Sequence, residues 1–251
     1  MLAAAALRLA VIEALCPTAA VRGEDGATFP TLAEHRVFDS RQILVDELDD
    51  ARPYTPSISV YVEDVRVERR GDAAPSVRGN PTCTLVIVTE LAEIARDPDG
   101  DAVRQENGNL ATMALVDSDP RQRLVLEALT AQVRKVIVRG PEAVAVRRVM
   151  KAVQSIELEA FSLPQLSRRW LRYLMLVSCE IADDKFTDAP GLPEPLRSVA
   201  AELPDGSYAK AKLAELGAAF LATSRDALDG IDVIASVNGV PVIRRPEATP
   251  D

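Results

Sequence analysis

The sequence predicts an α+β fold, in which a mixed, largely antiparallel sheet is flanked by helices and followed by a C-terminal helical and hairpin extension. Strongly apolar, strand-like runs at 57–63, 83–90, 155–161 and 170–181 indicate the sheet. Helical spacing of apolar residues between and around these runs indicates the helices. Because a short, turn-rich segment joins 57–63 to 83–90, an antiparallel pair is the most economical arrangement of these two strands.

The first element is expected to be an amphipathic helix over residues 2–15, which ends before a proline. A secretory signal peptide is a poorer interpretation, because Arg8 and Glu13 interrupt the apolar run and no cationic segment precedes it. No stretch reaches the roughly 18 uninterrupted apolar residues that a membrane span needs. A short strand at 35–40 and a charged stretch at 41–52 are expected to follow a Gly- and Pro-containing loop.

The first strong strand is predicted at 57–63, where Ile58 and Val60 alternate with more polar residues, as in a strand with one buried face. Residues 83–90 form a nearly continuous apolar run that predicts the second strand. Segment 97–118 contains few periodic apolar residues. It is interpreted either as a long loop or as a loop that contains a short helix.

The clearest helix signal covers residues 120–138. Asp119 is a candidate N-cap, and Pro120 occupies the first helical position, where its missing N–H costs nothing. Gly140 is expected to end this helix, and Pro141 to begin a second one.

The late run at 170–181 is apolar on both faces when it is written as a strand, which predicts a central strand covered on both sides. Prolines become frequent after residue 184, so the expected division is a domain at 1–184 and an extension at 185–251. The helix, the hairpin and the disordered tail of the extension are expected at 207–223, 233–243 and 246–251.

Composition and charge argue against several classes of function. The net charge is −9, from 29 Lys plus Arg and 38 Asp plus Glu, which counts against a protein that coats nucleic acid. Cys16, Cys83 and Cys179 lie far apart, which is typical of free cysteines in a reducing cytoplasm and excludes a CxxC zinc or redox motif. Cys83 and Cys179 are expected to pack as small apolar residues in the core.

No catalytic residue, cofactor site or metal ligand is assigned. His35 is the single histidine, which excludes a two-histidine metal site within one chain. The sequence contains neither a GxSxG nucleophile motif nor a glycine-rich phosphate-binding motif. The prediction is therefore that the protein is not an enzyme; a cytoplasmic enzyme that uses His35 with the acidic stretch is the less favoured alternative.

Two charged clusters are candidates for contact with another subunit or a partner protein. Nucleic-acid binding by the basic cluster is less favoured, because acidic residues are interleaved with its arginines. Cation binding by the acidic stretch is less favoured, because it lacks the glycine of a calcium-binding loop. The basic cluster consists of Arg66, Arg69, Arg70 and Arg78. The acidic stretch consists of Asp46, Glu47, Asp49 and Asp50.

Several short motifs occur in a distinctive order. The N-terminal helix is followed by R-V-F-D-S-R at 36–41, by P-S-I-S-V-Y-V-E-D at 56–64, by C-T-L-V-I-V at 83–88, and, after the capped helix, by R-Y-L-M-L-V at 172–177. This order resembles that of the tail terminator (tail completion) proteins of long-tailed bacteriophages. The resemblance covers about residues 2–182, and the additional length of this chain lies mainly in 97–118 and 185–251.

The resemblance implies a structural virion protein that assembles as a hexameric ring. Such a ring sits at the head-proximal end of the tail tube, stops tube polymerisation and joins the tail to the head. It implies as partners further copies of the chain, the major tail tube protein and the head–tail connector or stopper protein, with no membrane. The implied location is the neck region of the virion tail, and the host cytoplasm during assembly.

The negative charge agrees with that role, because genome DNA must pass through the ring without specific binding, and six acidic subunits repel phosphate. The main alternative within the same machine is another neck protein, such as a connector or stopper.

Overall fold

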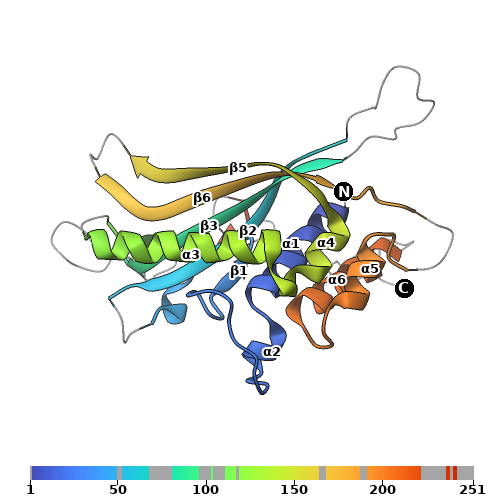
Figure 1. The fold of residues 1–251 in the computed structure, drawn as a ribbon, viewed down its shortest axis with the longest axis horizontal. Helices are drawn as coiled ribbons and strands as arrows, with labels where there is room; N and C mark the ends of the chain where they lie inside the picture. The colour runs from blue at the N-terminus through green and yellow to red at the C-terminus, as the bar shows by residue number, and fades with distance from the viewer. Residues whose placement is uncertain are drawn as a thin grey trace, which may run out of the picture.

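The computed structural model describes residues 2–49, 53–67, 81–95, 103, 111–116, 119–163, 168–186, 191–221, 236–237 and 240–241. Within these residues, a six-stranded, mostly antiparallel sheet is packed against a layer of helices (Figure 1). This arrangement confirms the predicted α+β class.

The sheet strands are β1 (Val37–Asp39), β2 (Thr55–Arg66), β3 (Thr82–Ile94), β4 (Thr112–Ala114), β5 (Met150–Leu163) and β6 (Arg168–Ile181). The helices are α1 (Leu2–Leu15), α2 (Thr18–Val21), α3 (Pro120–Arg139), α4 (Val144–Val149), α5 (Leu196–Glu202) and α6 (Tyr208–Leu221). The remaining elements are the 3₁₀ turns η1 (Val45–Glu47) and η2 (Pro141–Ala143) and the two-residue strands β7 (Ser236–Val237) and β8 (Val240–Pro241).

The strands of the main sheet lie in the order β1-β2-β3-β6-β5, with β4 added to the end of β3. Every pair is antiparallel except β1 with β2. Val60 of β2 lies opposite Ile87 of β3, and Ile87 lies opposite Met175 of β6. These three residues are buried in one core, as the alternating sequence pattern predicts.

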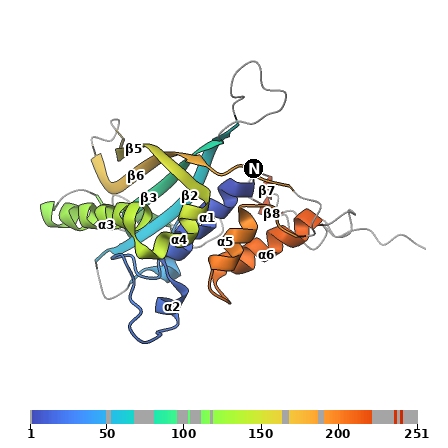
Figure 2. The ribbon, with the colours of Figure 1, turned by 45° about the vertical axis from the view of Figure 1, so that its right-hand side comes forward.

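The N-terminal helix α1 is central rather than amphipathic, which corrects the sequence-based expectation. Ten of its residues are buried. One side of α1 packs against β2 and α3, and the layer formed by α4, α5 and α6 covers the other side (Figure 2). A helix that is covered all round needs no polar stripe, which explains why charged residues in α1 are confined to Arg8 and Glu13.

The first turn of α1 is capped by a residue from a distant part of the chain. The carboxylate of Asp184 accepts hydrogen bonds from the backbone N–H groups of Leu2 (2.9 Å) and Ala3 (2.7 Å). Two N–H groups that the helix itself leaves without partners are thereby satisfied. The segment after β6 is therefore part of the structure that holds α1 in place.

Helix α3 begins and ends as predicted. The Asp119 carboxylate accepts a hydrogen bond from the N–H of Arg121 at 2.9 Å, which is the geometry of an N-cap. Gly140 follows the last turn, where a Cβ atom would lie 2.5 Å from the carbonyl oxygen of Val136. Only glycine fits this close approach of backbone to backbone.

Strand β6 is covered by helices on one face, so the predicted double coverage is wrong. Met175, Val177 and Cys179 are buried beneath the helices, whereas Leu174 and Leu176 on the opposite face are half-buried. In the described part of the chain, the helices that contact the sheet all share the core of the first face. Periodicity identifies apolar positions along a strand but not whether the rest of the fold covers both of its faces.

Several further elements escaped prediction, among them β4 and α5. Residues 112–114, within the segment interpreted as a loop or short helix, form β4, and residues 196–202, within a proline-rich stretch, form α5. Helix α6 lies at the predicted place, and β7 pairs antiparallel with β8 within the predicted hairpin. The tail expected at 246–251 lies outside the described residues.

The predicted boundary after residue 184 does not separate two cores. Leu196 and Val199 of α5 and Leu213 of α6 belong to the same buried cluster as α1 and the sheet. The described helices of the extension therefore pack as part of the main body.

An ion pair is buried on the sheet face opposite the helices. The side chain of Glu90 on β3 is 4% exposed, and its Oε2 accepts a hydrogen bond from Nε of Arg172 on β6 at 2.7 Å. The hydroxyl of Ser57 donates to Oε1 at 3.3 Å. The Arg172 guanidinium also lies 5.5 Å from the ring centroid of Phe161. Arg172 is thus the cation that neutralises a carboxylate shielded from water.

Replacing this cation alone should destabilise the fold. Arg172→Ala leaves the Glu90 charge buried without its partner, which typically costs roughly 3–5 kcal/mol. The double variant Glu90→Leu with Arg172→Met removes both charges and should lose much less stability. Urea denaturation followed by circular dichroism measures both free energies of unfolding, and equal losses in the two variants would contradict this account of the pair.

Candidate functional site

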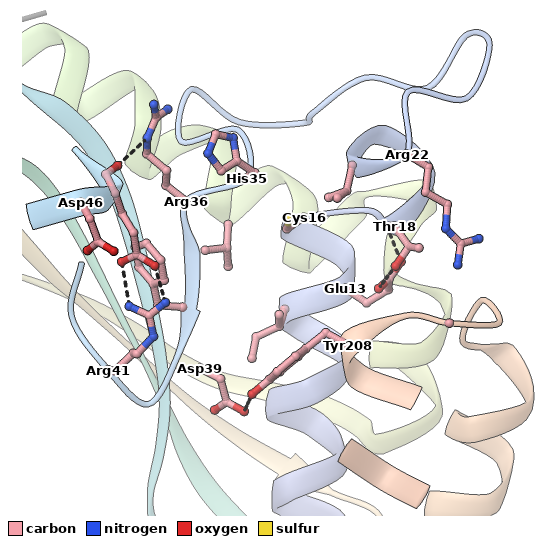
Figure 3. A pocket seen from close by; sticks show the side chains of 16 residues that line it. Glu13, Cys16, Thr18, Arg22, His35, Arg36, Asp39, Arg41, Asp46 and Tyr208 are labelled. Carbon is pink, nitrogen blue, oxygen red and sulfur yellow. Dashed lines mark hydrogen bonds and ion pairs between the residues drawn. The ribbon is translucent and has the colours of Figure 1, made fainter. Parts of the chain in front are cut away.

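A pocket of about 670 Å³ lies where the end of α1 meets α2, β1, η1 and the turn before α6 (Figure 3). These segments are distant in the sequence and are brought together by the packing around α1. The polar residues that line the pocket are Glu13, Cys16, Thr18, Arg22, His35, Arg36, Asp39, Arg41, Asp46, Glu47 and Tyr208.

One wall of the pocket is held by a two-point ion pair. Nη1 and Nη2 of Arg41 donate to the two carboxylate oxygens of Glu47 at 2.8 and 2.6 Å. The Arg41 hydrogen bond holds the pKa of Glu47 below its usual value. The guanidinium carbon of Arg41 also lies 4.2 Å from the ring centroid of Phe38. Arg41 is therefore occupied by partners of its own chain.

A second wall joins the C-terminal helices to the sheet. The hydroxyl of Tyr208, the first residue of α6, donates to the carboxylate of Asp39 on β1 at 3.0 Å. Burial, together with the negative charge of Asp39, raises the pKa of Tyr208 to about 12. Nε of Arg8 lies 2.7 Å from the other oxygen of Asp39. At neutral pH the phenol is protonated and acts as a hydrogen-bond donor.

The base of the pocket contains a carboxylate and a thiol. Glu13 accepts hydrogen bonds from both the N–H and the hydroxyl of Thr18, each at 2.8 Å. Burial nevertheless raises the pKa of Glu13. Burial, reinforced by the charge of Glu13, also raises the pKa of Cys16 to about 11. The Cys16 thiol is therefore protonated at neutral pH and is a poor nucleophile.

The environments of Cys16 and Tyr208 disfavour nucleophilic attack by either of these two side chains. Cys16 and Tyr208, two of the lining groups that become nucleophiles on losing a proton, are both held in their protonated forms. His35 lines the same pocket as Asp46 and Glu47, so the structure does bring together the groups of the alternative enzymatic hypothesis. Glu47, however, is already engaged by Arg41. Several of the donors that line the pocket, including Arg41, Tyr208 and Thr18, therefore act mainly within the chain itself.

The Arg41–Glu47 pair gives a pH-dependent expectation. Because the folded-state pKa of Glu47 is lowered, its contribution to stability is present above the unfolded pKa and is lost as the pH falls through the folded pKa. Arg41→Ala should raise the pKa of Glu47 toward its usual value, as measured by NMR titration of the side-chain carboxyl carbon. Arg22→Ala, which changes another arginine of the same pocket, should leave that pKa unchanged.

The structure places Arg66 and the described part of the acidic stretch at opposite ends of β2. Arg66 is exposed at the last position of β2, whereas the N–H of Asp49 donates to the hydroxyl of Thr55, the first residue of that strand, at 2.7 Å. Twelve residues of strand span roughly 36 Å, so the two ends do not meet within one subunit. Arg69, Arg70, Arg78 and Asp50 lie outside the described residues.

The acidic stretch is partly neutralised inside its own chain. Glu47 pairs with Arg41, and Nη2 of Arg36 lies 3.8 Å from the carboxylate of Asp49. Asp46 is exposed. Sequence reasoning treated the stretch as a free acidic patch because it could not place the two arginines that precede it.

A second hollow, which sequence reasoning did not identify, lies between α3 and strands β5 and β6. Its volume is about 750 Å³. Ile156, Leu158 and Met175 supply apolar walls, and three cations of α3 line it as well. These cations are Arg134, Lys135 and Arg139. We call this hollow the α3–β5 groove. Its signal in the sequence was a cluster of cations at the end of an otherwise ordinary amphipathic helix.

Comparison with known proteins identifies no family. No model of a known protein family matches the chain, and no curated protein matches it. The described helices include none that is long and apolar enough to cross a membrane. Among the described residues, no group of three or more His, Cys, Asp or Glu side chains is placed to hold a metal ion.

Proposed function

We propose that the protein is a phage tail terminator, a structural virion protein that forms a homohexameric ring at the head-proximal end of the tail tube. The ring stops tube polymerisation and joins the tail to the head. The proposal is supported by the order of the elements that carry the sequence resemblance, since α1, the short strand β1, the long strands β2 and β3, the capped helix α3 and the late strand β6 follow one another in that order, with other elements between them.

The observation that carries the proposal is the exposed edge of the sheet at β5. Within the described residues, this 14-residue strand pairs only with β6. A long unpaired edge is a template for pairing with another chain. Leu158, which is 52% exposed, and the cationic α3–β5 groove lie beside this edge. The edge and groove supply an extended surface on one side of the subunit.

A closed ring requires two unlike surfaces on each subunit, one for each neighbour. The opposite edge of the sheet is β1, next to the acidic stretch. The cationic groove at one edge and the exposed carboxylate of Asp46 beside the other are complementary in charge, which favours head-to-tail association of copies.

Mass photometry and negative-stain imaging of the purified protein test this proposal directly. We expect rings of about six chains. Leu158→Glu should dissociate them, because it places beside the groove a charge of the same sign as the acidic surface proposed to dock there, whereas Leu124→Glu on an outer position of α3, 64% exposed, should leave them intact. A monomeric wild-type protein that does not bind or shorten tail tubes would overturn the proposal.

A stopper or connector role within the phage neck is the closest alternative. Such a protein would bind the head portal complex without limiting the length of tubes assembled from the purified tube protein. Tube length measured with and without the ring separates this role from termination.

A small-molecule enzyme is the second candidate function, because His35 shares the pocket of Figure 3 with Asp46 and Glu47. It would be favoured by a monomer with hydrolytic activity that is lost in His35→Ala. The tail terminator proposal expects His35→Ala to leave ring assembly and tube capping unchanged.

A further inference from the structure

Two cysteines far apart in the sequence face each other in the core. Cys83 on β3 lies directly opposite Cys179 on β6 in the antiparallel ladder. Their sulfur atoms are 3.7 Å apart, and the residues are 2% and 0% exposed. Both are free thiols in this structure. Neither cysteine lines the pocket or the α3–β5 groove.

The backbone already provides the geometry of a disulfide. Residues directly opposite in an antiparallel pair have Cα atoms about 4.5 or 5.5 Å apart, and both spacings lie within the roughly 4.4–6.8 Å that disulfides adopt. The sulfur atoms need to approach by about 1.7 Å to reach the S–S bond length of about 2.0 Å. We expect rotation of the two side chains to close this gap, because the backbone spacing of a directly opposed pair already suits a disulfide.

The strand next to Cys179 is irregular at this point, so we expect local opening of β5 to be the step that admits a small oxidant to the pair. Val153 of β5 lies opposite Cys179, and the register of β5 shifts both before and after Val153. Val153 is also partly exposed, on the edge strand of the sheet. Bulged edge strands have disrupted ladders and open at lower free energy than central strands.

We propose that Cys83 and Cys179 are an oxidation site that closes to an intramolecular disulfide between β3 and β6. With hydrogen peroxide as the oxidant, one thiol loses its proton and its sulfur attacks a peroxide oxygen. The O–O bond breaks, giving a sulfenic acid and water. The second sulfur then attacks the sulfenic sulfur and displaces a second water. The pair loses two electrons and two protons, and one peroxide becomes two waters.

The bond would tie the two central strands of the sheet across a loop of 96 positions. Cross-links over long loops restrict the unfolded chain strongly, so the oxidised protein should unfold at a higher temperature. For a virion protein, oxidation would follow release from the reducing cytoplasm. That timing rests on the proposed function, whereas the chemistry of the pair does not.

The test uses the Cys16→Ser variant of the 251-residue chain, in which Cys83 and Cys179 are the remaining cysteines. The purified protein is incubated with hydrogen peroxide, denatured, alkylated and analysed by intact-mass and peptide mass spectrometry. We expect a loss of two alkylation sites, a mass lower by two hydrogens, and a linked peptide pair containing Cys83 and Cys179. The melting temperature should rise by at least about 5 °C and return on reduction.

The matched controls are Cys83→Ala and Cys179→Ala in the Cys16→Ser chain, which retain one core thiol each. Neither should form an intramolecular bond or gain melting temperature on oxidation. Two alkylatable thiols after oxidation of the parent chain, or sulfinic acids or bonds between chains in place of the internal disulfide, would overturn the proposal. Because the assay needs no tail tube, its failure is distinct from failure of the terminator function.

Discussion

Val177→Asp should abolish folding of the whole chain. Val177 lies on β6, is 1% exposed, and packs in the core that the sheet shares with α1, α3 and α5. An aspartate there is shielded from water without a cation beside it, which costs several kcal/mol. Native domains are typically stable by only about 5–15 kcal/mol. We expect loss of the native circular dichroism spectrum and of cooperative thermal unfolding.

The neighbouring residue provides the control. Ser178 lies on the opposite face of the same strand and is half-buried. Ser178→Asp introduces the same charge one position along β6, so it should remain folded with a much smaller loss of stability. A soluble, cooperatively folded Val177→Asp with an unchanged melting temperature would show that this face of β6 is not part of the core.

Reversing the basic cluster should block tail completion without unfolding the subunit. Arg66 is exposed at the end of β2, and Arg69 and Arg70 follow it in the sequence. Under the proposed function these residues contact carboxylates of a neighbouring subunit or of the tube. A single exposed ion pair is worth only about 0.2–1 kcal/mol, so one substitution should be nearly silent. Changing all three to Glu places like charges together at every copy of the contact.

We expect this triple variant to keep its circular dichroism spectrum yet yield overlong tubes or tails that do not join heads. The control is the triple variant of Arg121, Lys185 and Arg197 to Glu, which changes the net charge equally at exposed positions elsewhere. If the Arg66–Arg69–Arg70 variant caps tails of normal length and gives infectious particles, the cluster is solvated surface and takes no part in the contact.

Local signals in the sequence predicted those elements whose structure depends mainly on nearby residues. The cap at Asp119, the stop at Gly140 and the alternation around Val60 each reflect a constraint within a few positions of the chain. The four long strands and α3 were therefore predictable, and with them the fold class.

Features that depend on distant contacts were not predictable. The sequence predicted α1 as an amphipathic helix with one exposed face, but in the structure α5 and α6 cover that outer side. The pocket combines Glu13, Asp39 and Tyr208 from three separated segments, and no spacing in the sequence relates them. The charge of Glu47 was visible, but its pairing with Arg41 depends on the turn at η1.

The buried position of α1 has a consequence for biosynthesis. This helix leaves the ribosome well before part of its cover, because Leu196, Val199 and Leu213 lie far downstream of α1 in the sequence. At a translation rate of about 5–20 residues per second, these covering residues are synthesised roughly 10–40 s after α1. During this interval its apolar surface is open to solvent and to other nascent chains. Ribosome-associated chaperones should therefore hold this chain longer than one whose first helix is packed by its immediate neighbours.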